Sequence, residues 1–80
     1  MTTNAAIKNR ILELCGQKNI TINKLATESG IPRSTIKNIL YGKSQNPGIL
    51  TIKKLCDGLE ITLPEFFNTK VFEELEQEIR

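Results

Sequence analysis

The sequence predicts an all-α protein. Apolar residues recur at three- and four-residue intervals through most of the chain, which is the pattern of amphipathic helices. No segment alternates with the two-residue period of a half-buried strand, and glycine, proline and asparagine divide the helical stretches into short pieces. We therefore expect a bundle of five short helices followed by a C-terminal amphipathic helix.

The first helix is expected over about residues 5–18. Its apolar face is formed by residues at i, i+4, i+7 and i+8, namely Ile7, Ile11, Leu14 and Cys15. Asn4 can cap the start of this helix, and either Gly16 or Asn19 can end it.

Two shorter helices lie on either side of Gly30. The first covers residues 22–29, and the hydroxyl of Thr21 can accept an amide of its first turn. Gly30 ends it, because glycine adopts the left-handed backbone conformation without steric cost. Pro32 presets the backbone angle for a new helix over about residues 33–41. The residues of that helix that face inward are Ile36, Ile39 and Leu40.

A fourth and a fifth helix follow the turn-rich loop GKSQNPG. The fourth covers about residues 49–59, and its inward positions are Ile52, Leu55, Cys56 and Leu59. Thr62 and Glu65 have the spacing of a capping box, which predicts a fifth helix over about residues 63–68.

The acidic remainder of the chain predicts a sixth helix, over residues 70–80. Phe72, Leu75 and Ile79 share one face of it. This face can fold back onto the first and fifth helices as extra core, or it can pair with a copy of itself. We favour a homodimer formed through it, because two-fold dimers are the commonest soluble oligomers.

Length and composition exclude several classes of protein. Eighty residues make a single domain over 1–80, with its core in 5–68, and 39% apolar with 25% charged residues is typical of a soluble globular chain. No apolar run reaches the ~20 residues of a membrane span, and the N-terminus has no signal-peptide pattern. We expect a cytoplasmic protein that does not bind membranes.

The sequence lacks the residue patterns typical of metal sites and catalysis. It has no histidine and no CxxC pair, so no metal site and no small-molecule cofactor is expected. Cys15 and Cys56 lie on apolar faces and are expected to be buried thiols. Without histidine, a clustered carboxylate pair or a glycine-rich phosphate loop, the chain is not expected to be an enzyme.

The charges are unevenly divided. Residues 1–64 hold nine basic and four acidic residues, a net charge of +5, whereas residues 65–80 carry −3. A basic body favours an anionic partner, and the acidic tail indicates a different role for the C-terminus.

The two helices around Gly30 have the spacing of a helix-turn-helix, in which the second helix can enter a DNA major groove. The positions that carry this pattern are Leu25, Ala26, Gly30, Ile31, Ile36 and Ile39. Residues 5–67 resemble the lambda repressor and Cro-like family of transcriptional regulators, often called the Xre family. The resemblance lies in INKLATESGIPRSTIKNILYGK and NPGILTIKKLCDGLEITLPEFF. It implies a lambda-repressor-like bundle and a DNA-binding regulator of transcription, in particular a repressor.

The chain departs from the family pattern at several positions. Ile22 replaces a polar residue at the start of the second helix, Ser29 replaces an apolar residue before the turn, and Glu60 replaces the glycine that often ends the fourth helix. An ion pair of many members is replaced by Cys15 and Leu40. None of these positions lies on the face expected to read DNA.

That face belongs to the helix over 33–41. Its polar residues at i, i+1, i+4 and i+5 are Arg33, Ser34, Lys37 and Asn38. Arg33 can bind the O6 and N7 atoms of guanine, and Ser34 discriminates weakly among bases. Lys37 can reach guanine or a phosphate, and Asn38 adenine or a phosphate. On an arbitrary helix such a face would be merely solvated; within a helix-turn-helix we expect it to contact double-stranded DNA.

The DNA phosphates are expected to meet the starts of two helices and one loop. The helix starts contribute Thr21, Asn23, Gly48 and Ile49, and the loop contributes Lys43, Ser44 and Asn46. An ordinary solvated turn remains an alternative for the loop. Tyr41 can stack on a sugar or close the edge of the core, and we favour the core.

A second functional class stays open. The fold could serve as a protein-interaction module, for instance an accessory subunit or an antitoxin-like partner. Such a surface would show aromatic or apolar residues on the helix over 33–41. The polar residues found there favour DNA.

Overall fold

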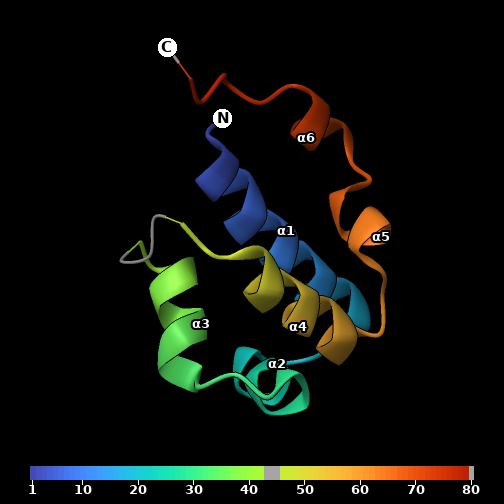
Figure 1. The fold of residues 1–80 in the computed structure, drawn as a ribbon. Helices are drawn as coiled ribbons and strands as arrows, with labels where there is room; N and C mark the ends of the chain where they lie inside the picture. The colour runs from blue at the N-terminus through green and yellow to red at the C-terminus, as the bar shows by residue number, and fades with distance from the viewer. Residues whose placement is uncertain (43–45, 80) are drawn as a thin grey trace.

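The computed structural model describes residues 1–42 and 46–79, and within these ranges it contains six helices and no strand. Figure 1 shows α4 in the middle of the molecule with α1, α2 and α3 around it. The helices are α1 (Thr3–Lys18), α2 (Ile22–Ser29), α3 (Arg33–Leu40), α4 (Ile49–Leu59), α5 (Leu63–Phe67) and α6 (Lys70–Glu73). The all-α prediction is confirmed. None of the described helices is long and apolar enough to cross a membrane.

Threonine side chains begin three of the helices. Thr2 accepts the amide of Ala5 at 3.2 Å, so α1 starts two residues before the expected position and is not capped by Asn4. At its other end, Asn19 rather than Gly16 takes the left-handed conformation, with φ 54°. Thr21 and Thr62 cap α2 and α5 as predicted.

The core lies where α2 and α4 pack against each other and against α1. The largest fully buried side chains come from α1 to α5 and are Ile11, Leu25, Ile36, Ile39, Leu55, Leu59 and Phe66. Each such side chain stabilises the fold by about 1.5–3 kcal/mol relative to leaving it in water. Cys15 and Cys56 are buried among them, as expected, and this burial raises the pKa of both thiols.

Arg10 joins α1 to the end of α5. Its Nε donates to the carbonyl of Phe66 at 2.7 Å, and its Nη2 donates to the carbonyl of Glu65 at 2.8 Å. The remaining guanidinium nitrogen pairs with the carboxylate of Glu13. The carbonyl of Glu65 also accepts the amide of Asn68 at 3.4 Å, whereas the carbonyl of Phe66 is one of the last carbonyls of the helix and is satisfied by Arg10.

The sixth helix is much shorter than expected. It was predicted over residues 70–80, but α6 ends at Glu73, and residues 74–79 form a non-helical segment that we call the strap. A helix through the strap would place Glu74 one turn from Glu78 on the same face, and like charges at that spacing are destabilising. Glutamates are also unfavourable at a helix C-terminus, and a helix this short is marginal unless it is well packed.

The apolar face of the C-terminal segment folds back onto its own chain at Phe72. The Phe72 ring lies 5.0 Å from that of Phe67 and 6.2 Å from that of Phe66, measured between centroids. This is the fold-back arrangement that the sequence left open. Ile79, by contrast, is 77% exposed and takes no part in the core.

The strap returns to the N-terminus of α1, and Figure 1 shows the red C-terminal segment running back toward the start of α1. The amide of Glu76 donates to the carbonyl of Met1 at 3.4 Å, and the hydroxyl of Thr3 donates to the carboxylate of Glu78 at 2.9 Å. A carboxylate at this place is favoured by the positive end of the α1 dipole.

Candidate nucleic-acid interface

The turn between α2 and α3 is set by Gly30. Its φ of 65° lies in the left-handed region, and its amide donates to the carbonyls of Ala26 and Thr27. Ile31 follows with its amide on Ala26 at 3.0 Å and its side chain buried in the core. Pro32 then begins α3, and its carbonyl accepts the amide of Thr35 at 3.0 Å. This is the helix-turn-helix geometry that the sequence predicts.

The two sides of α3 differ sharply in exposure. Ile36, Ile39 and Leu40 are buried against the core. The opposite face carries the four residues predicted to read bases, all of them exposed: Arg33, Ser34, Lys37 and Asn38. The turn therefore holds one side of α3 in the core and presents the other to solvent.

The cations on this face form no ion pair with another described residue. Three ion pairs join described residues: Arg10 with Glu13, Lys24 with Glu28, and Lys53 with Asp57. Arg33 and Lys37 belong to none of them. Their charges remain available to an anionic partner.

The first turns of α1, α2, α3 and α4 differ in whether a side chain caps them. The first turns of α1 and α2 are capped by threonine hydroxyls, whereas Pro32 and Gly48 give no side-chain hydrogen bond to α3 and α4 in the described part of the chain. The first turns of α3 and α4 thus have no capping side chain among the described residues. A helix start of this kind attracts phosphate oxygens.

The residues predicted to meet phosphates lie at opposite ends of α4. Thr21 lines a shallow hollow with Gly58 and Glu60, at the C-terminal end of α4, while Gly48 and Ile49 begin the helix. Eleven residues of helix span about 16 Å at a rise of 1.5 Å per residue. This is of the order of the ~12 Å width of a major groove.

The two α2 residues predicted to contact phosphates are accessible. Thr21 and Asn23 are both exposed. The Thr21 oxygen already accepts the amide of Lys24 at 3.1 Å, but its hydroxyl proton can still be donated.

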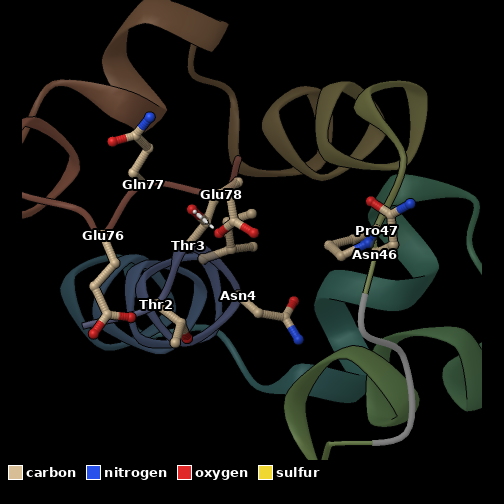
Figure 2. Close-up of a pocket in the computed structure, with 9 residues that line it drawn as sticks. Thr2, Thr3, Asn4, Asn46, Pro47, Glu76, Gln77 and Glu78 are labelled. Carbon is tan, nitrogen blue, oxygen red and sulfur yellow. Dashed lines mark hydrogen bonds between the residues drawn. The ribbon is translucent and has the colours of Figure 1, made fainter. Parts of the chain in front are cut away.

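The loop before α4 is described only in part. Lys43 and Ser44 lie outside the described residues. Asn46 is exposed, and with Pro47 it lines one side of a hollow of about 490 Å³. Figure 2 shows the other side, where Glu78 lies over Thr3. The acidic strap therefore comes close to a loop that is predicted to contact phosphate.

Tyr41 is the residue that sequence reasoning placed wrongly. It was expected to close the edge of the core, but its side chain is 70% exposed at the end of α3. The residue before it, Leu40, is buried. The four-residue spacing from Arg33 and Lys37 to Tyr41 is the signal that could have placed it on the exposed face.

Comparisons with known proteins agree on one family. The family model described as "Cro/C1-type HTH DNA-binding domain" matches residues 10–70. The HTH-type transcriptional regulator SlrR of Bacillus subtilis (strain 168) is 37% identical over 54 residues, which cover 68% of this chain and 36% of that regulator. The crystal structure of the prophage Lp1 protein 11 superposes with a TM-score of 0.82 at 36% identity, over 94% of this chain and all of that one.

Proposed function

Because the chain belongs to the family of Cro/C1-type helix-turn-helix DNA-binding domains, we propose that it is a sequence-specific transcriptional repressor whose α3 reads a major groove. The observation that carries this proposal is the exposed face of α3, where Arg33 and Lys37 have no acidic partner among the described residues. A cationic, hydrogen-bonding face on a helix held out by a turn suits the base edges of a duplex.

The contacts divide into two classes in this proposal. Base edges are read by Arg33, Ser34, Lys37 and Asn38. Phosphates are held by Thr21, Asn23, Lys43, Ser44, Asn46, Gly48 and Ile49. Phosphate contacts position the protein on the duplex, whereas base contacts give sequence preference.

The proposal includes a homodimer acting in the cytoplasm. Two copies related by a two-fold axis would read half-sites one helical turn, about 34–36 Å, apart. Because α6 ends at Glu73 and Phe72 packs within its own chain, we place the dimer contact outside an extended helix over 70–80. Repression requires only occupancy, since a bound protein excludes others from the same DNA.

Selection from a library of random duplexes tests the proposal. We expect recovered fragments to share a short pseudo-palindrome, and binding to the selected duplex to weaken steeply as salt rises. Binding without sequence preference, or no binding, would contradict the proposal and favour the protein-interaction module. Sedimentation of the free and bound protein measures the number of copies on each duplex.

A further inference from the structure

Tyr41 continues the exposed row of α3 beyond the residues assigned above. Arg33, Lys37 and Tyr41 are spaced by four residues, so each lies one turn above the last on nearly the same face. The Tyr41 amide donates to the carbonyl of Lys37 at 2.8 Å, which holds it in the last turn of the helix. The backbone of Tyr41 is therefore fixed at the end of α3.

The Tyr41 side chain is largely exposed in the described part of the chain. The side chain is 70% exposed, and the aromatic contacts between described residues involve only Phe66, Phe67 and Phe72. No hydrogen bond joins the Tyr41 phenol to another described residue. Gly42 follows with φ 90° and has no side chain that could cover the ring.

We propose that Tyr41 contacts the DNA backbone, with its hydroxyl donating to a phosphate oxygen and its ring lying on the adjacent sugar. Tyrosine is among the residues that bind phosphates through a neutral donor. Tyr41 lies eight residues from Arg33, about 12 Å along the helix at 1.5 Å per residue. This separation matches the ~12 Å width of the groove, so a base contact at Arg33 places Tyr41 near the groove wall. The inference rests on the proposed function, since it requires α3 in a DNA groove.

The chemistry of this contact predicts a particular signature. A neutral hydroxyl releases no counterion from DNA, so its loss lowers affinity without changing the salt dependence. A phosphate contact carries no sequence information, so the loss is the same for every duplex. Lysine and arginine contacts to phosphate do change the salt dependence, which separates Tyr41 from the phosphate contact proposed for Lys43.

Tyr41→Phe keeps the ring and removes only the donor. We expect it to weaken binding to the selected duplex and to a scrambled duplex by the same factor, about fivefold. The slope of log affinity against log salt should stay at the wild-type value. Lys43→Gln is the comparison variant, because the proposal assigns Lys43 a phosphate contact; the salt slope of that variant should fall by about 0.9. Thermal unfolding of Tyr41→Phe should match the wild type, because the hydroxyl has no partner among the described residues.

The wild-type chain offers a direct probe of the same contact. Tyr41 is its only tyrosine, so protein labelled with 3-fluorotyrosine gives a single ¹⁹F resonance. We expect this resonance to shift when the selected duplex is added, and its H₂O/D₂O solvent isotope shift to fall as the ring loses water.

Four results would overturn the inference. Wild-type affinity in Tyr41→Phe would do so, whatever the resonance does. A loss confined to the selected duplex would indicate base reading instead. A resonance that responds to protein concentration but not to DNA would place Tyr41 against a second copy of the chain. If the wild-type chain binds neither duplex, the proposed function itself fails, and this inference fails with it. In the other three cases the proposed DNA binding stands, and only the assignment of Tyr41 is wrong.

Discussion

A Cβ atom added at Gly58 of α4 would lie 2.1 Å from the hydroxyl oxygen of Ser29 in α2. It would also meet the Ser29 backbone nitrogen at 3.0 Å and its Cβ at 3.1 Å. The two helices therefore approach so closely that only glycine fits at this point of the core. Ser29 is buried here, and its hydroxyl oxygen has no hydrogen-bond partner among the described residues.

Gly58→Ala should destabilise the protein. Alanine forms helix better than glycine, but the added methyl group forces α2 and α4 apart, and overpacking of this kind costs about 1–3 kcal/mol. Urea unfolding measures the change. Gly16→Ala is the matched control, because no atom lies within 4 Å of a Cβ at that helical position. It should stabilise by about 0.5–1 kcal/mol. Equal effects of the two substitutions would rule out close packing at Gly58.

Glu60→Gly should stabilise the end of α4. Glu60 ends the helix with φ 59°, a conformation that a side chain disfavours and glycine adopts freely. The expected gain is about 0.5–1 kcal/mol in the free energy of unfolding. Gly30→Ala is the opposite kind of substitution, because it adds a side chain to a residue with φ 65°. A Cβ there would meet no atom within 4 Å, so the strained backbone alone should lower the free energy of unfolding by about 1–2 kcal/mol. A loss of stability in Glu60→Gly would mean that the carboxylate has a role there that outweighs the backbone effect.

Arg10→Met should weaken the attachment of α5 to α1. Methionine keeps most of the apolar stem but cannot donate to the carbonyls of Glu65 and Phe66. The Arg10 side chain is only 13% exposed, so water replaces these bonds poorly, and we expect a loss of about 2 kcal/mol. Lys24→Met removes a cation from the exposed pair with Glu28 and should change the free energy of unfolding by less than about 0.5 kcal/mol. Similar losses in both variants would contradict a specific role for Arg10.

The capping box of α5 should make stability depend on acid. The backbone amide of Thr62 donates to the Glu65 carboxylate at 2.9 Å, and this bond, together with the nearby Thr62 side chain, lowers the pKa of Glu65. A carboxylate with a lowered folded pKa stabilises the fold above its unfolded pKa of about 4.3, and the effect disappears as the pH falls through the folded pKa. The gap in melting temperature between wild type and Glu65→Ala should therefore be larger at pH 7 than at pH 3. A gap that widens in acid would show the sign to be wrong.

Arg33→Ala and Lys43→Ala should weaken DNA binding in different ways. Loss of a guanine contact should cost about 1–3 kcal/mol at one base pair and relax the preference there. Loss of a phosphate contact at Lys43 should weaken binding to all sequences alike and reduce the salt slope by about 1. Binding measured against every single-base variant of the selected duplex distinguishes the two. Identical profiles would show that the base and phosphate contacts have been sorted wrongly.

Features that depend on neighbouring residues could be predicted from the sequence. The apolar spacing of α1 to α4, the capping box of α5 and the turn at Gly30 all arise within one or two helical turns, where periodicity and caps decide the structure. The exposed face of α3 follows from the same periodicity, because Ile36, Ile39 and Leu40 fix which side is buried.

Features that depend on distant parts of the chain could not be predicted from the sequence. Arg10 meets its partners 55 and 56 residues further along, and nothing near it in sequence indicates them. The exposure of Tyr41 depends on how the chain leaves α3. The apolar spacing of Phe72, Leu75 and Ile79 favoured a helix over 70–80, but repulsion among the glutamates and the return of the strap to Met1 and Thr3 decided otherwise.

The buried thiols of Cys15 and Cys56 can report the local opening of two helices in the native chain. One lies in α1 and the other in α4, and burial raises the pKa of each, so an alkylating reagent finds neither thiolate in the closed protein. Modification must wait until the helix that carries the cysteine opens. The two alkylation rates, resolved by mass spectrometry, therefore measure the local opening of α1 and of α4 separately, without any engineered label.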